Sequence, residues 1–256
     1  MFPVLFEFYD TVIPSWHVMV AIGGIAGYFL FSHNADPRTE QRDVKTIFAV
    51  GYISALFGAR WFSVFVEETH DSFSGYLEAI FSMGSMTFYG GALFGGLCVY
   101  VVTLIKGHSA RRVLDLAIPA LLLGLFFGRI GCFLNGDDYG IPYPNQESPP
   151  WWAYAIPVLN DGIARYPVQI FESTLSLLLA VSLSFLNYLK FLKPGLVGAF
   201  GILGYSISRF FIEFYRGDYR GPTTLPLSPS QIISLVLLVV TVAYIGFIRT
   251  KPPRPC

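Results

Sequence analysis

The chain has 256 residues, of which 13% are charged and 54% are hydrophobic, and its formal net charge at pH 7 is zero. Soluble domains carry roughly a quarter charged residues, so this composition excludes an ordinary soluble domain and indicates a chain solvated by lipid. The neutral charge argues against a nucleic-acid partner. The spacing of Cys98, Cys132 and Cys256 matches neither a zinc site nor a disulfide framework, so we expect no metal.

The N-terminal stretch has no basic residue, and Glu7 and Asp10 interrupt its apolar run. We therefore expect a short interfacial segment rather than a cleavable signal peptide. Beyond it, seven stretches are long and apolar enough to cross a bilayer as helices, which takes about 20 residues. They lie at 16–33, 46–66, 86–105, 113–134, 167–189, 196–214 and 230–248. Because these stretches lack strict alternation, the sequence predicts an all-α integral membrane protein rather than a β-barrel.

Glycines at helical spacing, such as Gly23 with Gly27 and Gly91 with Gly95, predict closely packed helices. We expect one transmembrane domain over 1–256, with 136–166 as a small outer-face subdomain. The sequence PPWW (149–152) in that segment is compatible with a functional lid and equally with an aromatic belt at the membrane interface.

The basic residues predict the orientation of the chain. Eleven of them lie in the loops 34–45, 106–112 and 190–194 and in the tail from 249. The segments on the opposite side include the acidic loop 67–71 and carry only three basic residues, Arg165, Arg216 and Arg220. The positive-inside rule then places the N-terminus outside and the C-terminus in the cytoplasm. An odd number of spans requires the same arrangement.

Three arginines, Arg60, Arg129 and Arg209, lie within the predicted spans. A central arginine costs about 3 kcal/mol on insertion scales, so it needs a partner, a water-filled cavity or an anionic ligand. Snorkelling from a helix end is the competing interpretation, since all three lie near the outer ends of their helices.

The polar residues near these arginines favour a ligand. Arg209, Glu213 and Arg216 have the spacing of one helix face. Glu172 and the turn Tyr89–Gly90–Gly91 are expected at the same outer-leaflet depth as Arg60, Arg129 and Arg209. The residues just beyond the helix end of Arg129 are also polar or small: Asn135, Asp137, Asp138 and Gly140. Three guanidiniums with two carboxylates leave positive charge, and guanidinium suits phosphate, so the pattern indicates a phospholipid headgroup.

Four stretches resemble the prolipoprotein diacylglyceryl transferase family in order and spacing. They are GARWFSVF (58–65), GRIGCFLNGDDYG (128–140), YPVQIFES (166–173) and GYSISRFFIEFYRGD (204–218). The resemblance covers nearly the whole chain. It implies an enzyme of the bacterial inner membrane that moves a diacylglyceryl group from phosphatidylglycerol to the lipobox cysteine thiol of a prolipoprotein signal peptide, without a metal or nucleotide cofactor.

The resemblance also implies roles for individual residues. Arg129 would hold the lipid phosphate and Arg209 would stabilise its departure. Glu213 and Arg216 would orient Arg209 and the headgroup. The remaining substrate-binding residues would be Arg60, Gly90, Gly91, Asn135, Asp137, Gly140 and Glu172.

The chain departs from the family pattern at the expected base for the thiol. Tyr89 stands where the family has histidine, and a phenol of pKa about 10 is a poor proton acceptor for a thiol of pKa about 8.5. His17, where the family tends to carry tyrosine, supplies an imidazole from the first span or is simply an interfacial histidine. Cys132 replaces an asparagine, Asp137 a glutamate and Tyr166 a histidine.

These departures leave other functions open. They are a diacylglyceryl transferase with a different acceptor, a homologue that only binds lipid, and an anion or lipid transporter.

Overall fold

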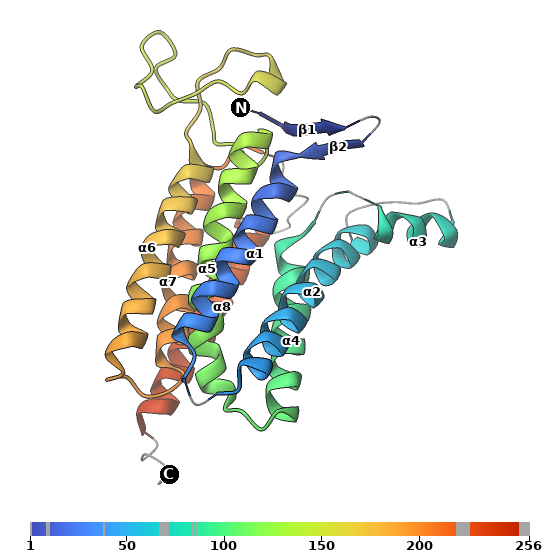
Figure 1. The fold of residues 1–256 in the computed structure, drawn as a ribbon. Helices are drawn as coiled ribbons and strands as arrows, with labels where there is room; N and C mark the ends of the chain where they lie inside the picture. The colour runs from blue at the N-terminus through green and yellow to red at the C-terminus, as the bar shows by residue number, and fades with distance from the viewer. Residues whose placement is uncertain are drawn as a thin grey trace. The chain divides into compact units, whose positions relative to one another are not determined.

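The computed structural model describes residues 2–8, 11–37, 39–66, 72–82, 84, 86–218 and 226–250 (Figure 1). Several residues used above lie outside the described ones: Asp10, Arg38, the acidic loop 67–71, Arg220, Lys251, Arg254 and Cys256. The predicted orientation stays a prediction.

The described residues form seven helices that are long and apolar enough to cross a membrane. They are α1 (Ser15–Asn34), α2 (Gln41–Val66), α4 (Phe88–Ile105), α5 (Ala110–Asn135), α6 (Val168–Leu189), α7 (Leu196–Ile212) and α8 (Pro229–Thr250). The predicted all-α membrane fold and its seven spans are therefore confirmed (Figure 1).

Two features differ from the sequence prediction. The N-terminal segment is an antiparallel hairpin of β1 (Val4–Phe8) and β2 (Thr11–Pro14). A short helix, α3 (Phe73–Phe81), follows the second span, and the Ser72 side chain caps its first turn by accepting the Gly75 N–H at 3.2 Å. With nine residues, α3 is too short to be found by a search for spans.

The chain folds as two compact units, Met1–Leu30 with Leu114–Cys256, and Phe31–Val113. The single domain expected over 1–256 therefore stays a prediction. In the first unit the glycine spacing produces the close approach it predicts: an added Cβ at Gly23 would lie 3.0 Å from the Gly124 carbonyl oxygen on α5. In the second unit Gly91 and Gly95 pack in the same way against Ala55 of α2, which runs beside α4 (Figure 1).

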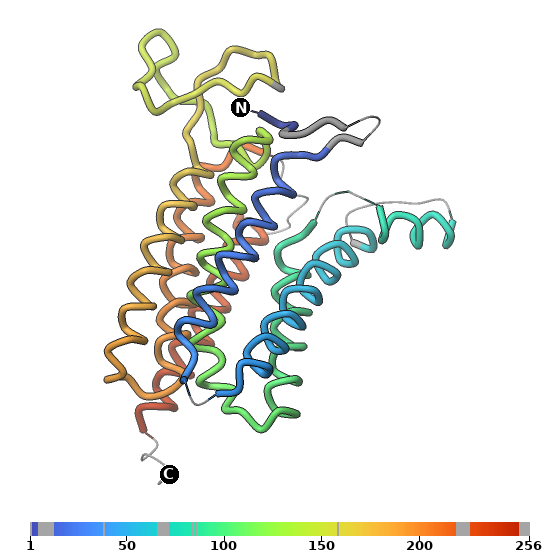
Figure 2. The backbone as a smooth tube through the Cα atoms, in the orientation of Figure 1, coloured from blue at the N-terminus to red at the C-terminus, as the bar shows by residue number. Residues whose placement is uncertain are grey.

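The segment 136–166 joins α5 to α6 and folds back on itself (Figure 2). It contains one 3-10 turn, η1 (Pro157–Leu159), and isolated β-bridges join Arg165 to Pro142 and to Tyr154. Trp152 packs against Tyr166 and Phe171, whereas the neighbouring Trp151 is 94% exposed. The tandem tryptophans thus divide between internal packing and an exposed surface.

A buried carboxylate fixes the start of α7. Gly195, with a φ of 94°, precedes the helix and offers no side-chain cap. Instead, Asp115 of α5 accepts the N–H of Gly195 at 2.6 Å and of Gly198 at 2.7 Å. The helix that carries Arg209 is therefore fixed to α5 through backbone groups that would otherwise be unpaired.

We predict that Asp115→Ala lowers the free energy of unfolding by about 1–3 kcal/mol, because it leaves two buried N–H groups without an acceptor. Thermal unfolding of the detergent-solubilised protein measures the change. Asp115→Asn, which keeps one carbonyl acceptor, is expected to lose less. Equal unfolding temperatures for wild type and Asp115→Ala would contradict this role.

Candidate functional site

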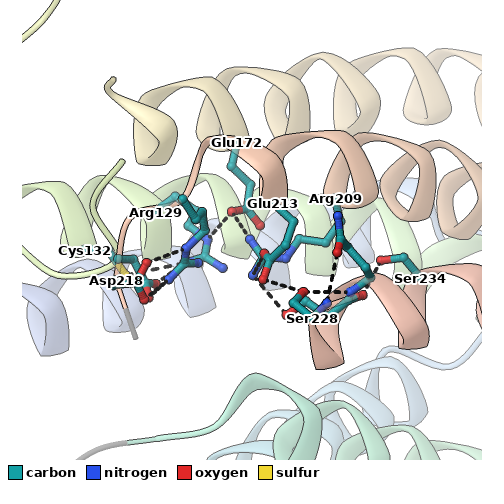
Figure 3. A network of polar contacts seen from close by, with 12 residues as sticks. Arg129, Cys132, Glu172, Arg209, Glu213, Asp218, Ser228 and Ser234 are labelled. Carbon is teal, nitrogen blue, oxygen red and sulfur yellow. Dashed lines mark hydrogen bonds and ion pairs between the residues drawn. The ribbon is translucent and has the colours of Figure 1, made fainter. Parts of the chain in front are cut away.

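A single carboxylate joins two arginines from different helices in the first unit. Glu172 of α6 lies 3.0 Å from Arg129 Nε on α5 and 2.9 Å from Arg209 Nη1 on α7, both through its Oε2. Its other oxygen, Oε1, accepts the hydroxyl of Tyr205 at 2.9 Å. The Glu172 side chain is only 3% exposed, so three helices converge on one buried charge (Figure 3).

The network continues from Arg209 to the start of α8. Arg209 Nη2 lies 3.1 Å from Glu213 Oε2, and Ser228 donates to Glu213 Oε1 at 2.8 Å (Figure 3). Ser228 also accepts the Gln231 N–H at 3.2 Å, while the Gln231 side chain accepts the Ser228 N–H at 3.0 Å. This reciprocal capping, with Pro229 as the first residue of α8, ties the helix start to the site.

At the other end, Asp138 lies between two guanidiniums. Arg129 Nη1 contacts its Oδ2 and Arg216 Nη2 contacts its Oδ1. Arg216 also contacts Asp218, at 3.0 Å from Nε to Oδ1. The sequence prediction put Arg216 on one helix face with Arg209, but α7 ends at Ile212. After the 3-10 turn η2 (Glu213–Tyr215), extended backbone at Arg216 directs the chain to Asp138.

A left-handed turn places Asp138. After α5 ends, Gly136 has a φ of 88° and Asp138 a φ of 57°. The Cys132 carbonyl accepts the N–H groups of Gly136 at 2.9 Å and Asp137 at 3.0 Å, which closes the helix end. Gln169 of α6 donates to the Asp137 carbonyl at 2.6 Å, so the turn is held from both sides.

The other predicted residues of this turn make no ion pair with the arginines that the structure describes and instead shape the turn or pack beside it. Asn135 donates its side-chain amide to Asp137, whose side chain is exposed. Gly140 pairs with Arg216 in a β-bridge, and an added Cβ there would strike the Tyr166 carbonyl. Only glycine fits so close to a second backbone. Cys132 is buried, with its sulfur 3.9 Å from Arg129 Nη1.

The charge of this network differs from the sequence expectation. Three guanidiniums meet four carboxylates: Arg129, Arg209 and Arg216 with Asp138, Glu172, Glu213 and Asp218. Within this network of contacts carboxylates are therefore in excess by one, where the spacing argument predicted excess positive charge. That argument counted Arg60, which lies in the second unit, and left out Asp138 and Asp218.

The pKa values of two carboxylates outside the spans, Asp138 and Asp218, are shifted in opposite directions by burial and by the nearby arginines. Burial by itself raises the pKa of Asp138, but the charges of Arg129 and Arg216 outweigh it and hold that pKa well below its usual value. Burial raises the pKa of Asp218 above its usual value despite the nearby Arg216. Asp138 is thus the firmly ionised member of the pair.

His17 lies in the first unit, near the start of α1. The preceding residue, Trp16, packs on α5 at Gly131, where an added Cβ would lie 3.1 Å from the Trp16 Cα, and Gly131 is two residues beyond Arg129. Both ring nitrogens of His17 are buried and have no hydrogen-bond partner among the described residues. Buried polar atoms are rarely left unpaired, so this imidazole has donor and acceptor capacity for a further group.

The second unit contains the other predicted site residues: Arg60, Tyr89, Gly90 and Gly91. Arg60 of α2 donates from Nε and Nη2 to the Ala79 carbonyl near the end of α3, at 2.9 and 2.7 Å. Gly90 packs against Phe62, and an added Cβ at Gly91 would lie 3.0 Å from the Ala55 carbonyl oxygen. The catalytic role predicted for Tyr89 and the substrate-binding roles predicted for Arg60, Gly90 and Gly91 stay predictions.

The amino-acid sequence of the chain is similar to those of known proteins over nearly its whole length. The family described as prolipoprotein diacylglyceryl transferase matches residues 3–247. This chain belongs to that family. A phosphatidylglycerol–prolipoprotein diacylglyceryl transferase from Clostridium tetani is 31% identical over 243 residues, covering 94% of this chain and 95% of the relative. One from Idiomarina loihiensis is 30% identical over 270 residues, covering 99% and 94%.

The buried network contains residues that the sequence analysis did not assign to the predicted site. Tyr205 and Ser228 each complete the hydrogen bonding of a buried glutamate, and Asp138 joins two arginines. Helical spacing offered one signal, because Tyr205 lies four residues before Arg209. No comparable signal marks Asp138, whose partner Arg216 is 78 residues away in the chain.

We predict that Asp138→Asn lowers the unfolding temperature at pH 7, and that this difference shrinks as the pH falls below about 4. The sign follows from the depressed pKa: the ionised carboxylate stabilises the folded state above its unfolded pKa, and that stability is lost on protonation. Thermal unfolding from pH 7 to pH 3 measures it. Glu147→Gln, at an exposed residue in the same segment, serves as control, and a difference independent of pH would contradict the assignment.

Proposed function

We propose that this protein transfers a diacylglyceryl group from phosphatidylglycerol to the cysteine thiol of a prolipoprotein. The observation that carries the proposal is the convergence of three buried guanidiniums around Glu172 and Asp138 in a family of this activity. One guanidinium can bind two phosphate oxygens through two parallel N–H groups. A phosphate bound at this depth in a membrane protein is most simply that of a lipid headgroup.

The chemistry explains why several arginines are needed. The thiolate sulfur attacks the diacylglyceryl carbon that is bonded to the phosphate oxygen, so a carbon–sulfur bond forms as the carbon–oxygen bond breaks. The phosphodiester carries one negative charge, and the released glycerol phosphate carries up to two. Arg129 and Arg216 hold the phosphate, and Arg209 stabilises the charge that develops on departure.

Glu172 fixes the geometry for this step. Because it holds Arg129 and Arg209 through one oxygen, both guanidiniums are oriented before lipid arrives. Such preorganisation avoids a reorganisation cost during the reaction. Glu213 holds Arg209 from its other side.

His17 is the proposed acceptor of the thiol proton. Its two ring nitrogens have no hydrogen-bond partner in the part of the chain that the structure describes, and they lie near the start of the helix that packs beside Arg129. Both observations support this role. An unprotonated imidazole is a common general base near neutral pH and can accept the proton of a thiol. The proton then passes to water or to the released phosphate.

The partners follow from the reaction. We propose that the thiol belongs to the lipobox cysteine of a prolipoprotein signal peptide and that the enzyme resides in the bacterial inner membrane, with its basic loops in the cytoplasm. Its lipid-facing helices contact the bilayer, and no nucleic acid takes part. Asn135, Asp137 and Gly140 of the first unit keep the substrate-binding roles that the family resemblance implies. Arg60, Gly90 and Gly91 of the second unit keep theirs as well.

An assay with phosphatidylglycerol vesicles and a lipobox peptide tests the function. We expect equal amounts of thioether-linked peptide and glycerol phosphate with the wild type, and a kcat lowered roughly 10²–10³-fold by Arg209→Ala, since one donor to the developing charge is lost. Arg209→Lys keeps the positive charge, so it serves as a control for misfolding caused by loss of the buried ion pairs.

Arg165→Lys is the matched control for this assay. Arg165 is also a buried arginine in an ion pair, with Asp161 at 2.6 Å, but it lies outside the network. We expect its kcat to stay near the wild-type value. No thioether product from folded wild-type protein would reject the proposed reaction.

His17→Gln tests the proton acceptor, because glutamine keeps hydrogen-bonding groups but does not titrate near neutral pH. We expect the rate of the wild type to rise with pH through an imidazole-like pKa and level off, and the variant to lose this rise together with about 10²–10⁴-fold in rate. An unchanged pH profile would exclude His17. Tyr89→His in the His17→Gln background shows whether an imidazole at residue 89 restores turnover.

A further inference from the structure

We propose that the carboxylate of Asp138 occupies the place of the lipid phosphate and must be displaced before the phosphodiester can bind Arg129 and Arg216. The inference rests on the proposed function, because it names the group that competes with substrate at the same site. Its basis is that each oxygen of Asp138 contacts a guanidinium from a different part of the chain.

The geometry resembles that of a bound anion rather than an ordinary ion pair. Arg129 comes from the end of α5 and Arg216 from the extended residue after η2, so the two approach Asp138 from separate elements. A phosphodiester likewise presents two non-bridging oxygens to two donors. The carboxylate therefore satisfies the pair of guanidiniums in the way that a phosphate would.

The charge of the network makes simple addition of phosphate unfavourable. Carboxylates already exceed guanidiniums by one among the contacts described above. A phosphodiester beside an ionised Asp138 would place two like charges together in a poorly screened site. Exchange of one anion for the other keeps the charge constant, so displacement is the favourable route.

Among the four carboxylates, Asp138 is the one that can leave most easily. Its side chain is 31% exposed, compared with 20% for Asp218 and 3% for both Glu172 and Glu213. Water can solvate the Asp138 carboxylate once it turns away, whereas Glu172 would remain buried and unpaired.

The backbone indicates that a side-chain rotation suffices for this exchange. The turn is held by the Gln169 hydrogen bond to the Asp137 carbonyl and by the bridge between Gly140 and Arg216. These contacts involve the main chain on both sides of Asp138 and are independent of its carboxylate. Arg129 also keeps its contact with Glu172, and Arg216 its contact with Asp218, so both guanidiniums stay in place while their shared anion changes.

The exchange has consequences for both ends of the catalytic cycle. Without lipid, Asp138 compensates two guanidiniums that are 10% and 4% exposed. After transfer, its return assists release of glycerol phosphate. Asp138 thus acts as a competing anion that lowers the affinity of the site for substrate and product alike.

The test compares wild type with Asp138→Asn as full-length protein in nanodiscs. We expect the variant to have a KM for phosphatidylglycerol and an inhibition constant for glycerol phosphate each lowered about tenfold, within the range of site–site coupling. Asp138→Glu retains the competing charge, so both constants are expected to be higher in this variant than in Asp138→Asn. Asp161→Asn, the same change in the Asp161–Arg165 pair, is the matched control.

Unchanged or weakened binding by Asp138→Asn would overturn the proposal, since Asp138 would then merely order the arginines. Binding of glycerol phosphate and of inorganic phosphate is measured separately by calorimetry, without turnover. Tighter binding of glycerol phosphate alone favours a site for the whole headgroup, and tighter binding of both favours the phosphate itself. Because these measurements need no transfer, failure of the transferase assay and failure of this inference are distinguishable.

Discussion

The shared carboxylate of Glu172 is the interaction on which the rest of the site depends. It lies almost fully buried between Arg129 and Arg209, so its removal would leave two guanidiniums without their common partner. Removing one partner of a buried ion pair costs about 3–5 kcal/mol, so this contact stabilises the packing of α5, α6 and α7 around it. The capping of α7 by Asp115 and of α8 by Ser228 holds the same helices from outside the ion pairs.

A catalytic site of this kind must satisfy two opposing demands. Arginines that will stabilise a departing phosphate have to remain charged within a membrane protein before any phosphate is present. Internal carboxylates meet that demand, but each one also competes with the substrate. The two carboxylates differ in side-chain exposure, which is 3% for Glu172 and 31% for Asp138. In the proposed exchange Glu172 remains bound to its arginines, and Asp138 gives way to the phosphate.

The sequence predicted those parts of this arrangement that follow from local composition. The spans follow from runs of apolar residues, and Arg129 and Arg209 were recognisable because charges are rare in such runs. The hairpin of β1 and β2 and the short α3 are too small to give a comparable signal.

Contacts between residues far apart in the sequence could not be predicted from helical spacing. Helical periodicity assumed that α7 continues to Arg216, whereas a 3-10 turn intervenes and redirects that side chain to Asp138. Similarly, nothing local to Arg60 indicates that its guanidinium binds the Ala79 carbonyl near the end of α3, 19 residues away. The excess of carboxylate in the network became visible only once these partners were known.

A structure of the protein with phosphatidylglycerol bound in a nanodisc tests the central claim most directly, because it locates the lipid phosphate relative to the arginines. The account predicts that the phosphate contacts Arg129 and Arg216, that Glu172 still holds Arg129 and Arg209, and that the Asp138 side chain has turned away. A phosphate bound elsewhere, with Asp138 still in contact with both guanidiniums, would contradict it.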